Sequence, residues 1–234
     1  AHAAITVDGE AARAAPGVLA IITFADIEHL AKPIPLRVGP LPGLERFLQL
    51  PLAKDRVCYV GEPIALVIAE DPYLAEDAAE LIDVAYDMLD PVLDAASAFS
   101  DATIVHPAVG TNRATHYKVS RGDADAAFAG AHYTRKEALR CHRHSALPLE
   151  TRGLVAEWDD LRKSLTVWGA TKVPFANRSA LADMLRLPEA QVELVEVDVG
   201  GSFGIRGDFY PEDFLVPFAA MRMGRPVKWI EDRR

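Results

Sequence analysis

The residues best suited to binding chemistry form a glycine-rich stretch, residues 199–207, which reads V-G-G-S-F-G-I-R-G. It follows an alternating apolar run over residues 192–197 and precedes a helix that we expect to open at residues 211–213. Glycine permits a sharp turn and a close approach to a ligand because it has no Cβ. A strand, a glycine turn and a helix N-terminus favour an anion site, since free N–H groups and the helix dipole point at the turn. A tight turn without a ligand looks the same, so these residues alone leave both interpretations open.

Periodicity and turn residues predict the elements that position this stretch. We expect helices over residues 8–15, from 24, from 72, over 123–128, 175–186 and 211–223, and strands over residues 4–7, 18–23, 56–59, 64–69, 84–86, 132–140, 154–158, 164–168, 192–197 and 227–230. Asp71 and Pro72 are a strong helix start, with an N-cap side chain followed by a first-turn proline. That helix and its flanking strands indicate a β-α-β unit. Residues 31–51, rich in proline and glycine, predict a long loop.

Composition restricts the class of protein. The chain has 234 residues, half of them apolar, and a net charge of −9, which argues against a nucleic-acid or anionic-membrane partner. No apolar run approaches the roughly 20 residues that span a bilayer. The only cysteines are Cys58 and Cys141, and two distant cysteines fit a reducing compartment. We therefore expect a cytoplasmic location.

A change in character over residues 107–123 predicts a domain boundary, with one α/β part over residues 1–112 and a second over residues 113–234. The chain starts without Met inside an expected strand and ends without a turn or capping signal. We therefore expect it to be a piece of a longer protein.

Several blocks, in order, resemble the molybdenum hydroxylases, the family of xanthine dehydrogenase, aldehyde oxidase and aerobic carbon monoxide dehydrogenase. In the first half the resemblance lies in residues 54–69 (K-D-R-V-C-Y-V-G-E-P-I-A-L-V-I-A), which match a family block centred on G-E-P, and in its continuation over residues 75–94. In the second half, residues 144–153, 165–172 (L-T-V-W-G-A-T-K), 199–204 (V-G-G-S-F-G) and 225–233 (R-P-V-K-W-I-E-D-R) resemble further family strands and its cofactor loop.

The resemblance implies an α+β fold in which a hammerhead domain is followed by the start of a molybdopterin-binding domain. It also implies an oxidoreductase that hydroxylates aldehydes or N-heterocycles, or oxidises carbon monoxide, with water as the oxygen source. The implied cofactor is molybdopterin with molybdenum, in the cytosine dinucleotide form. The [2Fe–2S] clusters and FAD are expected on partner subunits, in a dimer of heterotrimers that acts on a small-molecule substrate.

By resemblance the cofactor-binding residues are Gly200, Gly201, Ser202, Phe203, Gly204, Arg206 and Lys172. Phe203 and Gly204 are expected beside the metal. Ser202 replaces the usual middle glycine of the loop, and Lys172 replaces a glutamine that donates to the metal's oxo group. Either Lys172 contacts that group or an anionic substrate, or its side chain points elsewhere and the cofactor site is altered or absent.

Other candidate residues have competing interpretations. Gly207 stands where purine-oxidising members carry a glutamate, which argues against a purine substrate, and neighbouring Asp208 is a partial substitute or a solvated carboxylate. Arg206 and Arg178 are candidate phosphate contacts or surface ion-pair partners. Glu150 matches a family glutamate that we expect to support structure.

A zinc site is the remaining metal hypothesis. Cys141 and His142 would point to opposite faces of a strand, and with His144 they complete no four-ligand set. A zinc hydrolase is therefore only a remote alternative.

No catalytic residue is predicted in this chain. The family's general-base glutamate, in a G-x-G-E motif, is expected beyond Arg234. The chain alone is therefore predicted to be inactive. The alternative function is a binding or assembly module that keeps the fold without the cofactor.

Overall fold

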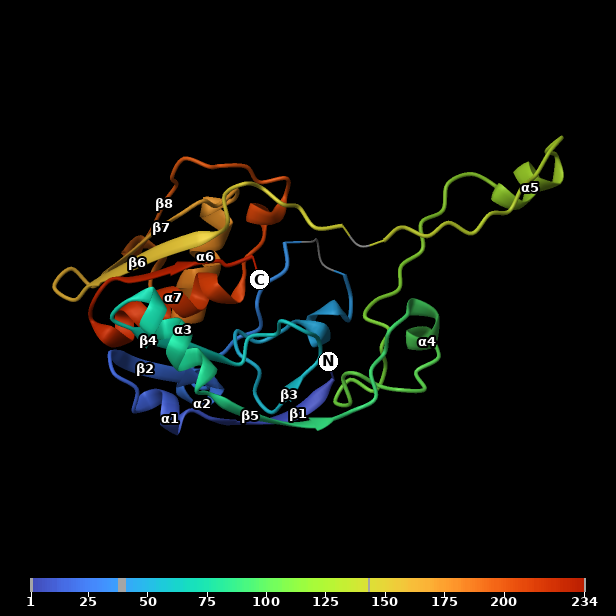
Figure 1. Ribbon diagram of the computed structural model, residues 1–234. Coiled ribbons are helices and arrows are strands. Elements are labelled where there is room, and N and C mark those ends of the chain that lie inside the picture. The colour runs from blue at the N-terminus through green and yellow to red at the C-terminus, as the bar shows by residue number, and fades with distance from the viewer. Residues whose placement is uncertain (1, 38–40, 143, 234) are drawn as a thin grey trace.

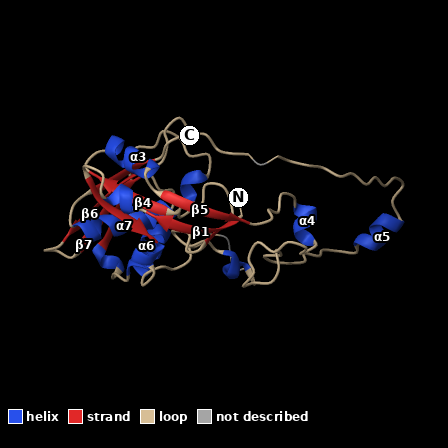
Figure 2. Cartoon of the chain, turned by 60° about the horizontal axis from the view of Figure 1, so that its bottom comes forward, coloured by secondary structure: helices blue, strands red, loops and turns tan. Residues whose placement is uncertain are grey.

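The computed structural model describes residues 2–37, 41–142 and 144–233. Within these residues the strands form sheets of order β3-β1-β5, β2-β4 and β8-β7-β6-β9. The sheets and most helices form one body, and a long excursion of the chain carries α4 and α5 away from it in both views (Figures 1 and 2).

The first half supplies two of the sheets. Its elements are β1 (Ala3–Asp8), α1 (Glu10–Arg13), β2 (Val18–Thr23), α2 (Phe24–Ile27), the 3-10 turn η1 (Leu44–Phe47), β3 (Arg56–Val57), β4 (Ala65–Ala69), α3 (Pro72–Glu80) and β5 (Asp83–Met88). The predicted start of α3 is confirmed, because the Asp71 carboxylate accepts the N–H groups of Tyr73 and Leu74, both at 2.9 Å.

The predicted β-α-β unit around α3 is wrong. β4 pairs antiparallel with β2, and β5 pairs antiparallel with β1 in a different sheet. A local pattern indicates that a segment is a strand but carries no information about its partner. The strand β3 is also shorter than predicted, since the Cys58 N–H turns to the Glu62 carboxylate at 2.6 Å.

The second half holds the sheet that positions the glycine stretch. Its elements are α4 (Ala95–Phe99), α5 (Ala124–Ala129), β6 (Gly153–Asp159), β7 (Ser164–Gly169), α6 (Pro174–Leu185), η2 (Glu189–Gln191), β8 (Val192–Val195), η3 (Ile205–Gly207), α7 (Pro211–Met223) and β9 (Val227–Ile230). β7 and β8 pair in parallel through the crossover helix α6, whereas β6 pairs antiparallel with β7 and β9. The carboxyl ends of β7 and β8 therefore lie side by side and place the segments after them next to each other.

The strand predicted over residues 132–140 is wrong. These residues form an irregular, exposed part of the excursion, with Tyr133 76% and Leu139 85% exposed. Alternation predicts a strand only where a partner strand takes up the backbone hydrogen bonds, and the described residues offer none there. The short helix α4 was not predicted from the sequence.

The main core joins both halves. The buried residues Ile22, Ile27 and Leu52 of the first half belong to the same cluster as Leu165 and Phe214 of the second. α7 runs through this core and continues past the buried Pro217, as the sequence predicts. The residue after α7, Gly224, has φ 60°, a left-handed cap that favours glycine. No helix of the described residues is both long and apolar enough to cross a bilayer.

Candidate functional site

The glycine loop, defined as residues 199–207, connects β8 to α7 and turns through left-handed backbone. Gly201 and Gly204 have φ of 107° and 103°, and Phe203 between them has φ 50°. This region suits glycine, whereas a bulky side chain adopts it at an energetic cost. The Phe203 side chain is 80% exposed, so internal packing does not offset that cost. Strained backbone of this kind concentrates at functional sites.

A buried arginine is hydrogen bonded to the backbone of the glycine loop. Arg206 is 4% exposed, and its Nε donates to the Gly201 carbonyl oxygen at 2.8 Å. Its Nη2 donates to the Glu150 carboxylate at 2.8 Å and to the backbone oxygens of Glu150 and Thr151 at 3.0 and 3.3 Å. The same carboxylate oxygen of Glu150 accepts the Gly200 N–H at 2.7 Å. We call this arrangement of Glu150 and Arg206 the clamp, and it ties the loop to the segment before β6.

The clamp also explains one glycine. A Cβ on Gly200 would lie 2.5 Å from the Glu150 Cβ, a distance that real Cβ atoms do not tolerate. Gly200 is therefore required by close packing of two backbone segments. The supporting role expected for Glu150 agrees with these contacts.

A surface cleft of about 380 Å³ opens above the clamp. It is lined by Thr171, Lys172, Glu196, Val199, Ser202, Phe203, Gly204 and Arg206. The Ser202 hydroxyl oxygen is buried and has no hydrogen-bond partner among the described residues. Buried polar atoms are nearly always paired, so this hydroxyl is suited to a ligand in the cleft.

The structure brings the predicted cofactor residues together in two layers. Lys172, Ser202, Phe203, Gly204 and Arg206 line the cleft. Gly200 and Gly201 lie in the clamp, where the Gly200 N–H and the Gly201 carbonyl are already hydrogen bonded. The N–H groups of residues 202–204 have no hydrogen-bond partner within the described chain and remain available as anion donors.

A third basic residue lies at the end of the glycine loop and was not predicted from the sequence. Arg37, from the long loop after α2, lies over Gly207 beside the Lys172 side chain. The backbone N–H of Lys172 donates to the Arg206 carbonyl oxygen at 2.8 Å, which fixes the start of that side chain. Nothing in the spacing of Arg37 points to the glycine loop, because the contact joins two distant segments.

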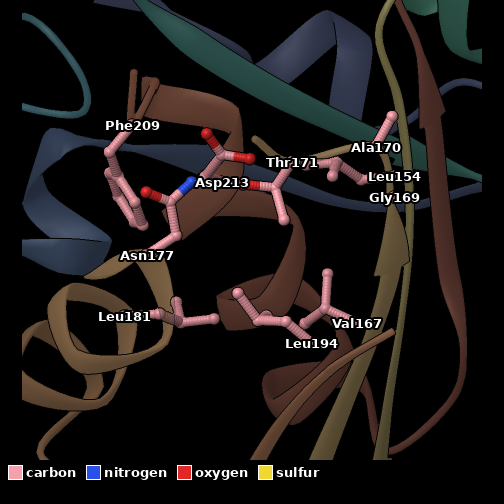
Figure 3. A pocket seen from close by; sticks show the side chains of 10 residues that line it. All are labelled: Leu154, Val167, Gly169, Ala170, Thr171, Asn177, Leu181, Leu194, Phe209 and Asp213. Atoms are coloured by element: carbon pink, nitrogen blue, oxygen red, sulfur yellow. Dashed lines mark hydrogen bonds between the residues drawn. The ribbon is translucent and has the colours of Figure 1, made fainter. Parts of the chain in front are cut away.

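A smaller cavity lies between the sheet, α6 and α7, with a volume of about 30 Å³ (Figure 3). Its polar end holds Thr171, Asn177 and Asp213, and its other end is lined by apolar residues such as Leu181 and Leu194. The Asn177 amide donates to the Thr171 hydroxyl at 2.9 Å, and the Asp213 carboxylate accepts the Tyr210 N–H at 2.8 Å. Burial raises the pKa of the Asp213 carboxyl to about 6. The space is that of a water molecule rather than a cofactor.

The remaining candidates lie elsewhere. Arg178 on α6 pairs with Glu189 at 3.4 Å and does not line the cleft. Asp208 is exposed next to the loop. Cys141 and His142 lie in the exposed excursion, and over the described part of the chain no three His, Cys, Asp or Glu side chains gather as a metal site.

Comparison with known families gives the class of this fold and site. Residues 105–234 match the molybdopterin cofactor-binding domain, and residues 1–90 match the a/b hammerhead domain of aldehyde oxidase and xanthine dehydrogenase. The chain therefore belongs to the molybdenum hydroxylase family, with the hammerhead and molybdopterin-binding folds that the resemblance predicts.

Individual relatives agree with this assignment. The chain is 39% identical to the 6-hydroxypseudooxynicotine dehydrogenase complex subunit gamma of Paenarthrobacter nicotinovorans, over 100% of this chain and 30% of the relative. It is 34% identical to the carbon monoxide dehydrogenase large chain of Afipia carboxidovorans, with the same two coverages. Quinoline 2-oxidoreductase from Pseudomonas putida 86 has a similar structure, with TM-score 0.90, 33% identity and coverage of 99% of this chain and 30% of that one. The chain thus spans about 30% of these relatives' length.

Proposed function

We propose that this chain forms one wall of the cofactor pocket of a molybdenum-dependent oxidoreductase. The enzyme would hydroxylate aldehydes, N-heterocycles or related small molecules, or oxidise carbon monoxide, with water as the oxygen source. One observation carries the proposal. The strained, exposed Phe203 and the unpaired Ser202 hydroxyl share a cleft with Lys172, Gly204 and Arg206, beyond the ends of β7 and β8.

The residues of the cleft fit a polyanionic pterin cofactor. The N–H groups of residues 202–204 and the Ser202 hydroxyl would hold its oxygen atoms, because converging backbone donors favour anions. When bound, the molybdenum centre supplies the oxidation chemistry. The clamp of Glu150 and Arg206 keeps the donors in place, and the exposed Phe203 ring lines the cleft beside them.

The Lys172 side chain would bring a positive charge to the same cleft. Its ammonium donates hydrogen bonds as a point charge. Gly207 presents no carboxylate to a substrate, which argues against purines.

The proposal extends to cofactor form and partners. We propose the cytosine dinucleotide form of molybdopterin, with [2Fe–2S] clusters and FAD on partner subunits in a dimer of heterotrimers. The names of two relatives, a "complex subunit gamma" and a "large chain", support an assembly of several subunits. A cytoplasmic location stays a prediction from the sequence.

A turnover assay tests whether the general base lies outside this chain. The general-base glutamate expected beyond Arg234 is needed for proton transfer, so the 234-residue chain supplied with molybdopterin should not turn over benzaldehyde with an artificial electron acceptor. The full-length gene product should turn over an aldehyde or N-heterocycle. Turnover by the 234-residue chain alone would contradict the proposed position of the base.

A binding or assembly module is the second candidate. The observation that favours it is the departure from the family pattern at two cleft residues, Ser202 and Lys172. A full-length product that assembles with its partner subunits but contains no molybdenum would support this module over the enzyme.

A further inference from the structure

Two basic side chains converge at the end of the glycine loop. An atom placed as a Cβ on Gly207 would lie 3.0 Å from Arg37 Nη2, 3.3 Å from Arg37 Cζ and 3.4 Å from Lys172 Cδ. Arg37 comes from the loop after α2 in the first half, whereas Lys172 directly follows β7 in the second. The fold therefore gathers two positive charges from opposite halves of the chain around one buried glycine.

No carboxylate neutralises this pair within the described chain. Neither Arg37 nor Lys172 takes part in an ion pair there, although the protein carries a net charge of −9. The nearby carboxylates form no ion pair with either residue in the part of the chain that the structure describes. Glu196, which lines the cleft with Lys172, accepts the Thr171 N–H at 3.2 Å, and Glu150 is held by Arg206 in the clamp. Within the described residues Asp208, next to Gly207, forms no ion pair with either basic side chain.

A guanidinium and an ammonium in the same surface region repel each other, and an anion bound between them would offset that repulsion. Both side chains are exposed at the protein surface, and Lys172 also lines the cleft. A planar guanidinium binds a carboxylate or phosphate through two parallel hydrogen bonds, and a neighbouring ammonium adds a third donor. The N–H groups of residues 202–204 have no hydrogen-bond partner among the described residues, and they provide further donors in the same loop.

We propose that Arg37 and Lys172 form a binding site for a carboxylate or phosphate group at the mouth of the cleft. Gly207 is the residue that keeps room for it, since any side chain there would displace the Arg37 guanidinium. The inference rests on the proposed function in one respect, because the anionic group belongs either to the pterin cofactor or to a substrate. This assigns a ligand role to Arg37 and gives Lys172 a role other than that of the glutamine it replaces.

Anion binding to the full-length protein tests the site. The protein is titrated at low salt with inorganic phosphate and with acetate, by calorimetry, as wild type, as R37Q/K172Q and as the matched control K118Q/R121Q. Lys118 and Arg121 are exposed in the excursion, so the control removes the same charge far from the cleft. We expect at least a tenfold loss of phosphate or acetate affinity in R37Q/K172Q and wild-type affinity in the control. Equal affinity in wild type and R37Q/K172Q, or an equal loss in the control, would overturn the proposal.

A second variant protects the test against simple misfolding. Gly207→Ala keeps both charges and removes only the space between them. It should therefore also weaken anion binding while leaving the far-ultraviolet circular dichroism spectrum unchanged. An unaltered affinity in Gly207→Ala, in a folded protein, would contradict the role of the glycine.

The molybdenum and pterin content of the same preparations identifies the source of the anion. A fall in cofactor content in R37Q/K172Q, together with weaker phosphate binding, assigns the site to a phosphate of the cofactor. Unchanged cofactor content with weaker anion binding assigns it to a carboxylate or phosphate of the substrate. A wild-type protein without cofactor would refute the proposed function, yet its phosphate affinity would still report on Arg37 and Lys172.

Discussion

Replacing Arg206 with methionine removes the central member of the clamp. The substitution deletes hydrogen bonds to the Gly201 carbonyl, the Glu150 carboxylate and the Thr151 carbonyl, at 2.8, 2.8 and 3.3 Å. Removing one partner of a buried ion pair lowers the free energy of unfolding by about 3–5 kcal/mol. The Glu150 side chain is 44% exposed, so water can solvate its freed carboxylate. We therefore expect a loss at the low end, about 3 kcal/mol.

Urea unfolding of the full-length protein, followed by tryptophan fluorescence, measures this loss. Arg206→Lys keeps the charge but not the forked geometry, and should lose about 1.5 kcal/mol. Arg162→Met serves as the matched control, because Arg162 is 83% exposed and its pair with Asp159 is 3.6 Å long; it should stay within about 0.5 kcal/mol of wild type. An Arg206→Met protein as stable as this control would refute the clamp. Cofactor content should fall in the same order, since the loop donors lose their support.

Other positions give independent expectations. Gly200→Ala places a Cβ 2.5 Å from that of Glu150 and should destabilise the fold by about 1–3 kcal/mol, seen as a lower Tm, whereas Gly130→Ala, with its nearest atom at 3.5 Å, should not. Burial raises the Asp213 pKa from 3.8 to about 6, so the folded state binds this proton more tightly than the unfolded state does. Stability should therefore fall as the pH rises from about 4 to 6, by at most about 1.4 kcal/mol per pH unit. Urea unfolding should show this slope reduced in Asp213→Asn; an unchanged slope would refute the assignment. Asp71→Ala removes an N-cap that accepts two backbone N–H groups and should cost about 1 kcal/mol in the same assay.

The elements that follow from local chemistry were predictable. The start of α3 depends on Asp71 and Pro72, and the end of α7 depends on Gly224. Each of these boundaries is therefore determined by residues adjacent to it in the sequence. The pairing of β4 with β2, by contrast, depends on contacts across the chain, and the sequence wrongly indicated a β-α-β unit there. The prediction of a strand over residues 132–140 was wrong for the same reason, because an alternating pattern does not supply a partner strand.

The candidate site divides in a similar way. The glycine loop carries its own signal, and five of the seven predicted residues line one cleft. The use of Arg206 in the clamp and the arrival of Arg37 over Gly207 depend on segments that meet only in the folded chain. Residue type identified the donors, but only the fold separates those that face the cleft from those that hold the loop.

The most direct test of the account is the molybdenum and pterin content of the full-length gene product, purified from a host supplied with molybdate. We predict stoichiometric molybdenum and pterin in wild type, and a deficit in Arg206→Met that Arg162→Met does not share. A wild-type protein that folds and assembles but contains neither metal nor pterin would contradict it.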